Sequence, residues 1–164
     1  MSTSTEIHPL VAQAKQETED CRAYLLNTFS FVPEGKLTWS PAETCKNAIQ
    51  IVAHCAVCND MFAERIKRVP WPDVPLSEFL ANRGRLEAEI TTREAAIQAL
   101  EDSCAKVQAA LDAMSQDDVD SVVETPAFSR PMTFFMFLPA KHMDGHACQI
   151  DFLQTCWGDM VVHF

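Results

Sequence analysis

Two histidines, His142 and His146, stand four residues apart toward the C-terminal end of the chain. Residues four apart lie on the same face of an α-helix, so both imidazoles can point at one spot. Helices that hold metals use this spacing to give two ligands to one ion. A third histidine, His54, lies far upstream in a second amphipathic segment. If the two helices face each other, three imidazoles converge and leave coordination positions open for a substrate.

The alternative for these histidines is an ordinary place in the core. A single histidine on an apolar helix face is usually a packed residue with a satisfied hydrogen bond. Two in one patch need a common partner, because each is a polar group removed from water. Gly145, which lies between them, costs about 1 kcal/mol relative to alanine in a helix interior. We interpret this glycine as a sign that a neighbouring helix or a ligand comes close.

Cys58 is a candidate fourth ligand, because it follows His54 by four residues and so shares its helix face. With Cys58 and the three histidines, a closed tetrahedral zinc site of structural role is the competing hypothesis to an open catalytic site. Cys55 and Cys58 also form a C-x-x-C pair. Their helical setting differs from the strand-to-helix turn of a redox motif, so we interpret both as small buried residues.

Asp60, Asp144 and Gln149 are candidate hydrogen-bond acceptors for the N–H groups of metal-bound imidazoles. For the two aspartates, a solvated position on a helix surface is the alternative. No residue stands out as a general base, so the sequence assigns no catalytic residue beyond the metal ligands.

Four long helical segments have to position these residues. The first covers about residues 7–29, and the second begins with Ser40, Pro41 and Glu43, which fit a capping box with proline at the first helical position. The second helix ends near Val69, before a group of prolines. A third helix opens at about residue 91. The last begins between residues 131 and 141, since Pro139 marks either its first turn or a kink, and ends at Gly158.

The connections between these helices contain no convincing strand. Residues 76–89 are ambiguous and favour a short helix, and the acidic residues 115–124 predict a surface connector. The fold class predicted is therefore all-α, an antiparallel four-helix bundle in one domain over residues 1–164.

The composition excludes several functions. A net charge of −10 argues against nucleic acid and anionic membranes as partners. The most apolar run, residues 134–140, is too short to span a bilayer. Residues 2–6 carry no basic and apolar signal segment, and the seven scattered cysteines are odd in number. These features favour a cytoplasmic protein with free thiols.

Several short motifs, in this order and spacing, resemble the DinB/YfiT-like superfamily. They are Leu37-Thr38-Trp39-Ser40-Pro41, Ile51-Val52-Ala53-His54, and His142-Met143-Asp144-Gly145-His146 followed by Gln149-Ile150. The resemblance implies a four-helix bundle, often dimeric, with a divalent metal on His54, His142 and His146. It also implies a metal-dependent thiol transferase or a related thiol-using enzyme, although many members have no assigned reaction.

These observations predict a metal-dependent enzyme that activates a low-molecular-weight thiol toward an electrophilic substrate. Three neutral imidazoles suit Zn, Ni or Fe, and the remaining coordination position would hold water or a thiol. The alternative is a non-catalytic helical bundle, related to stress, that is stabilised by metal or binds a small ligand. The apolar C-terminal segment, residues 157–164, leads us to expect a homodimer.

Overall fold

The structure is a computed structural model that describes residues 7–163. Residues 2–6, on which the expectation of no signal segment rests, lie outside the described part. Four long helices dominate the fold, joined by shorter elements and one small sheet. In chain order the elements are α1 (Pro9–Ser30), η1 (Glu34–Lys36), α2 (Ala48–Ile66), α3 (Leu76–Ala88), α4 (Arg93–Asp112), α5 (Gln116–Val119), β1 (Val122–Glu124), β2 (Ser129–Pro131) and α6 (Met132–Cys156).

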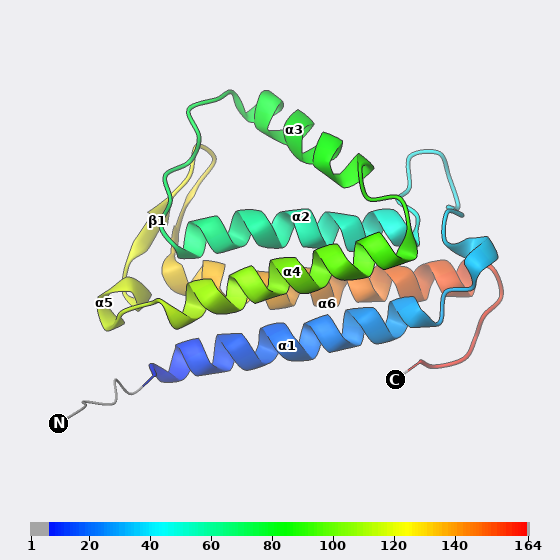
Figure 1. Ribbon diagram of the computed structural model, residues 1–164, viewed down its shortest axis with the longest axis horizontal. Helices are drawn as coiled ribbons and strands as arrows, with labels where there is room; N and C mark the ends of the chain where they lie inside the picture. Colours follow the sequence, from blue (N-terminus) through cyan, green and yellow to red (C-terminus); the bar gives the residue numbers. More distant parts are fainter. Residues whose placement is uncertain (1–6, 164) are drawn as a thin grey trace.

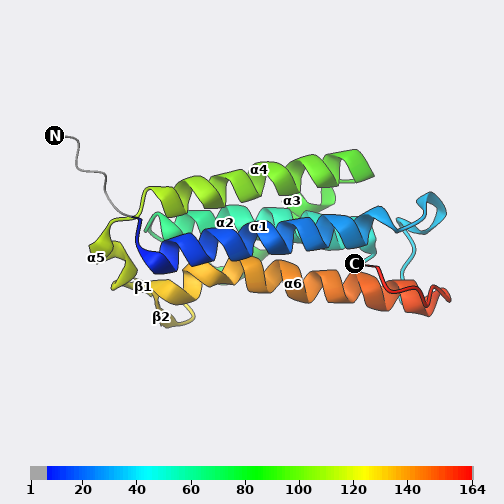
Figure 2. The same ribbon diagram turned by 90° about the horizontal axis from the view of Figure 1, so that it is seen from below.

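The four long helices lie side by side, two in each direction (Figures 1 and 2). Helices α1 and α6 run one way, and α2 and α4 run the other way. The most extensive packing joins α2 to α4 and α1 to α6, and both of these pairs are parallel. The arrangement therefore differs from the simple antiparallel bundle that we predicted. The reason is α3, which carries the chain back across α2 so that α4 starts from the same end as α2 (Figure 1).

A two-stranded antiparallel sheet precedes α6, although the sequence predicted no strand. Strands β1 and β2 pair with Val123 opposite Arg130. Each strand has three residues, and Val123 is the one residue of the two strands that is buried. Strands this short carry too little alternation to be recognised from the sequence. The hairpin closes one end of the helical layers (Figure 1).

Helix α2 begins at Ala48, seven residues after the proline at which we predicted its start. Asn47 caps it: its side chain accepts a hydrogen bond from the backbone N–H of Gln50 at 2.9 Å, and the Gln50 side chain accepts one from the backbone N–H of Asn47 at 3.0 Å. The Ser40 hydroxyl instead donates to the carbonyl of Ala42 within a turn. Both segments fit a capping box, and the second directly precedes the buried apolar run.

Helix α6 begins at Met132, so Pro139 lies inside it. It ends at Cys156, and Gly158 follows in the left-handed conformation with φ of 91°. This is the stop that the glycine predicted. The early start of α6 matters because it makes one continuous helix of the residues on both sides of His142 and His146.

The core consists of two groups of buried side chains along the helices. One group lies around Leu25, Phe29, Leu100, Met143 and Ile150, and the other contains Ile66, Leu111, Met132 and Met136. Burial of each large apolar side chain stabilises the fold by about 1.5–3 kcal/mol. Within residues 7–163, no helix combines the length and apolar character that crossing a membrane requires.

Candidate metal centre

The structure brings together the three histidines that the sequence singled out. His54 comes from α2, and His142 and His146 come from the facing side of α6. One ring nitrogen of each lies within 4.8 Å of those of the other two. The ring centroid of His54 is 5.0 Å from that of His142 and 4.9 Å from that of His146. The three imidazoles therefore surround one point between the two helices.

Two of the three rings are oriented by hydrogen bonds through Nδ1. His54 Nδ1 lies 2.7 Å from Oε1 of Glu87, and His146 Nδ1 lies 2.7 Å from Oε1 of Gln149. In the tautomer that carries the proton on Nδ1, each ring donates to these oxygens, and Nε2 is then the electron-pair donor. This is how metal-binding histidines are usually held.

Glu87 is the participant that the sequence analysis missed. It lies on α3 and is the one buried residue of that helix. Besides His54, its carboxylate contacts Nζ of Lys46 at 2.7 Å and Nε of Arg83 at 3.2 Å. Burial alone would raise the pKa of Glu87, but the hydrogen bonds from Lys46 and His54 outweigh burial and lower it. No pattern around residue 87 marks this role, which depends on how α3 crosses α2.

The imidazoles are in the form that binds metals. Burial, followed by the neighbouring His146 and His54, lowers the pKa of His142 to about 3, and burial also lowers the pKa of His146. Both rings are therefore neutral near pH 7, as metal ligands must be.

The contact between Nε2 of His146 and Nε2 of His142, at 3.2 Å, tests whether a cation fits. If His142 carries its proton on Nδ1, the two Nε2 electron pairs oppose each other. If it carries the proton on Nε2, the two rings are joined by a hydrogen bond instead. In either tautomer, Nδ1 of His142 is buried without a hydrogen-bond partner in the described part of the chain. A cation shared by the Nε2 atoms removes the opposition, so the residues present fit a divalent metal ion.

Cys58, the candidate fourth ligand, lies against His54 on the side of Glu87. Its Sγ is 3.7 Å from Nε2 and 3.8 Å from Nδ1 of His54. Cys58 forms a second group of candidate ligands with His54 and Glu87, separate from the group of three histidines. Burial raises the pKa of Cys58 to about 11, so the thiol is protonated near neutral pH.

The predicted hydrogen-bond acceptors lie in different environments. Gln149 accepts from His146, as described above. Asp60 instead pairs with Lys106, whose Nζ is 2.9 Å from both carboxylate oxygens. Asp144 is exposed to solvent. Gly145 has no atom within 4 Å of the position a Cβ would take, so the interpretation that a neighbouring helix comes close to this glycine is wrong.

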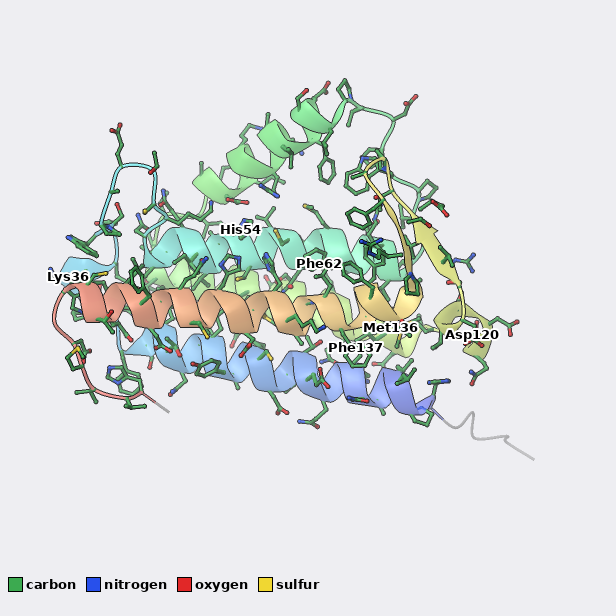
Figure 3. The ribbon with its side chains drawn as sticks, turned by 180° about the vertical axis from the view of Figure 1, so that it is seen from behind. Lys36, His54, Phe62, Asp120, Met136 and Phe137 are labelled. Carbon is green, nitrogen blue, oxygen red and sulfur yellow. The ribbon has the colours of Figure 1, made fainter. Side chains whose placement is uncertain are left out.

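Two features shape the surroundings of the histidines. The ring of Phe62 packs edge-on against His142, with centroids 5.4 Å apart. Figure 3 shows His54 and Phe62 along α2, the helix that α3 crosses. A cavity of about 340 Å³ borders His146, with Lys46, Cys45 and Gln149 among its walls. The candidate metal centre is therefore covered on one side and accessible on another.

The fold is a helical one in which two facing helices, α2 and α6, bring three histidines together. The chain belongs to the DinB superfamily, whose family model matches residues 17–150. No curated protein matches it.

Solved structures show the same fold at low sequence identity. The mycothiol-dependent maleylpyruvate isomerase matches with a TM-score of 0.68 and 15% identity, over 85% of this chain and 60% of that chain. A variant of that enzyme with one histidine replaced by alanine matches with a TM-score of 0.69 and 15% identity, over the same shares of the two chains. A DinB-like protein, YjoA, from Bacillus subtilis matches with a TM-score of 0.65 and 14% identity, over 92% of this chain and 95% of that chain. The present chain thus spans less than two thirds of the isomerase.

Proposed function

We propose that the protein is a metal-dependent enzyme that transfers a low-molecular-weight thiol to an electrophilic small molecule. The observation that carries this proposal is the convergence of three imidazole nitrogens from α2 and α6. Membership of the DinB superfamily supports it. The likeness to an isomerase that depends on mycothiol supports a thiol as the co-substrate.

In this proposal His54, His142 and His146 hold Zn, Ni or Fe. A bound divalent ion lowers the pKa of a coordinated thiol, so that thiolate is present at neutral pH. Glu87 and Gln149 keep two of the imidazoles in the orientation that binding requires, since each accepts a hydrogen bond from an Nδ1–H. Phe62 shields His142 from water by covering one edge of its ring.

The cavity beside His146 is the place that we propose for the thiol. Lys46 lines this cavity, and its ammonium group, which also contacts Glu87 at 2.7 Å, would be shared with a carboxylate of the thiol. In the transfer, the sulfur forms a bond to the electrophilic carbon. The bond from that carbon to the leaving group breaks with its electron pair, and the proton of the thiol is released to solvent.

Metal content tests the first part of the proposal. Protein purified without an affinity tag is measured by inductively coupled plasma mass spectrometry, beside His54→Ala and the control His8→Ala. His8 caps α1 and lies outside the group of three histidines. We expect near-stoichiometric divalent metal in the wild type and in His8→Ala, and a large loss in His54→Ala. Equal metal content in all three would remove His54 from the site.

Turnover tests the second part. Several cellular thiols are assayed with a chlorodinitrobenzene-type acceptor, using untreated, chelated and metal-reloaded protein. We expect activity that is lost on chelation and restored by one of the three metals. Absence of metal-dependent turnover with every thiol would favour the alternative, a bundle that is stabilised by metal or binds a small ligand without catalysis.

We further propose a homodimer in a reducing cytoplasm. The C-terminal segment exposes Met160, Val161 and Val162 by 78%, 68% and 68%, and Phe152 on α6 is also exposed. Contiguous apolar side chains on a surface are typical of association sites. All seven cysteines are free, as a reducing compartment requires. A monomeric mass by light scattering would refute the dimer.

A further inference from the structure

A second cavity, of about 490 Å³, lies beside Phe62 under the N-terminal half of α3. Its walls come from the C-terminal half of α2, the segment that joins α2 to α3, and the turn between β1 and β2. Most of the lining is apolar, and it includes the aromatic rings of Trp71, Phe79 and Phe128. This volume and this composition are typical of sites that bind small molecules.

One charged side chain in this cavity has no partner. Arg65 is 8% exposed and lines the cavity. Within residues 7–163 its guanidinium forms no ion pair, and no hydrogen-bond acceptor reaches Nη1. A buried charge without a partner is costly, and buried polar groups in native proteins are nearly always paired. The cavity therefore lacks the group that would satisfy Arg65.

Local structure explains where the guanidinium of Arg65 lies but gives its N–H groups no hydrogen-bond acceptor within the part of the chain that the structure describes. Its central carbon lies 5.2 Å from the centroid of the Trp71 ring, a cation–π contact. It also belongs to the last turn of α2, where the helix dipole favours a positive charge. Neither interaction provides a hydrogen-bond acceptor for the N–H groups of the guanidinium. Nε1 of Trp71, in the same cavity, also has no hydrogen-bond partner among the described residues.

The other charges around the cavity are already paired. Arg83 contacts Glu87 at 3.2 Å, and Glu64 contacts Lys67 at 2.9 Å. Glu87 is shared with Lys46, and Nε of Arg83 makes no hydrogen bond in the described part of the chain. The positive charge that has no carboxylate in ion-pair contact among the described residues of the lining is that of Arg65. It matches a monoanion, whereas a dianionic phosphate would place an excess negative charge among apolar walls. The planar fork of a guanidinium matches the two oxygens of a carboxylate.

We propose that this cavity binds an amphipathic carboxylate, with the carboxylate on Arg65 and an apolar chain or ring among the aromatic side chains. Leu76 and Leu80 on α3 line the cavity and are 46% and 42% exposed. A ligand with an apolar body would cover both. The proposal stands independently of the metal chemistry, although Phe62 contributes to this cavity and also packs on His142.

Isothermal titration of the full-length protein with octanoate, octanol, octylamine and octyl phosphate tests the proposal. The protein is kept metal-free with a chelator, so that a carboxylate cannot bind a metal ion instead. Because the chain carries a net charge of −10, general attraction of anions is not expected. We expect octanoate to bind at least tenfold more tightly than each of the other three compounds. Octanoate that binds no more tightly than octanol would overturn the proposal.

Variants locate the site. Arg65→Gln should lower the affinity for octanoate at least tenfold and leave the affinity for octanol unchanged. Arg85→Gln, at an exposed arginine on α3, should keep the wild-type affinity for both compounds. Equal octanoate affinity in Arg65→Gln and wild type would place the anion elsewhere. If Arg65→Gln does not fold, Trp71→Phe gives the same information. Octanoate should change the tryptophan fluorescence of the wild type, and this change should be lost in Trp71→Phe; a change that persists would overturn the location.

Discussion

Oε1 of Glu87 lies 2.7 Å from Nδ1 of His54, and this contact joins α3 to the candidate metal centre. The remaining residues of α3 are exposed or half-buried, and α3 is inclined to α2 with its C-terminal end the nearer (Figure 1). The carboxylate thus anchors the helix at the position where it supports a histidine. It contacts Lys46 from the segment before α2, His54 from α2, and Arg83 from α3 itself.

Replacement of Glu87 by glutamine should weaken metal binding about 10–100-fold, the usual effect of losing a carboxylate that orients a metal-bound histidine. Competition with a chromophoric chelator measures the affinity for zinc. Glu89→Gln is the matched control, because Glu89 is exposed and contacts Arg85 instead of the centre. Identical zinc affinity in both variants would mean that the contact between Glu87 and His54 has no part in metal binding.

The cysteines should differ sharply in reactivity. Cys45, Cys148 and Cys156 are exposed, whereas Cys58 and Cys104 are buried. Burial raises the pKa of Cys58 to about 11 and that of Cys104 to about 12, which keeps both as unreactive thiols.

Alkylation of the native protein with iodoacetamide near neutral pH, followed by peptide mass spectrometry, checks this difference. We expect rapid labelling of the three exposed cysteines, and labelling of Cys58, Cys104 and the equally buried Cys55 only after denaturation. Rapid modification of native Cys58 would contradict a buried, protonated thiol at this position. Cys58→Ala should retain its metal if the site consists of the three histidines.

Gly145→Ala should stabilise the protein by about 0.5–1 kcal/mol, because alanine has the higher helix propensity and the space for its methyl group is open. Urea unfolding measures the change. Gly158→Ala is the contrasting variant: the residue has φ of 91°, which alanine adopts only with strain, so we expect a loss of stability. A destabilising Gly145→Ala would restore the interpretation that this glycine accommodates a close neighbour.

Asp118 should make stability depend on pH. Its carboxylate accepts hydrogen bonds from the hydroxyl and backbone N–H of Ser115 and from Arg68, and these contacts lower its pKa in the folded state. A carboxyl group whose pKa is lowered on folding stabilises the folded state at pH values above its unfolded pKa of about 3.9. This contribution is lost as pH falls through the folded-state pKa.

Asp118→Asn should therefore lower the free energy of unfolding by about 1 kcal/mol near neutral pH, the usual size of a capping contribution. The difference from wild type should shrink in acid, as pH falls below the unfolded value of about 3.9 and through the lower folded-state pKa. Urea unfolding at both pH values measures it, with Asp117→Asn as the neighbouring control. If Asp118→Asn lowers the free energy of unfolding by the same amount at both pH values, the charge of Asp118 does not contribute to this stability.

The sequence alone determined the features that depend on local spacing. The interval of four residues between His142 and His146 predicted two imidazoles on one helix face, and the structure places them there with Nε2 atoms 3.2 Å apart. Gly158 predicted the end of the last helix because its backbone adopts a conformation that other residues avoid. Gln149 was a candidate acceptor, and it lies 2.7 Å from His146, three residues before it on the same helix.

Only the tertiary structure decided the features that depend on how distant segments cross. The parallel packing of α2 with α4 follows from the path of α3, and no periodicity encodes that path. Glu87 reaches His54 from 33 residues away, and Arg65 lacks a partner because of the particular walls that enclose it. Hydrophobic periodicity specifies which side of a helix is buried. It does not specify the neighbour that covers that side, because apolar contacts are non-directional and many partners would satisfy them equally well.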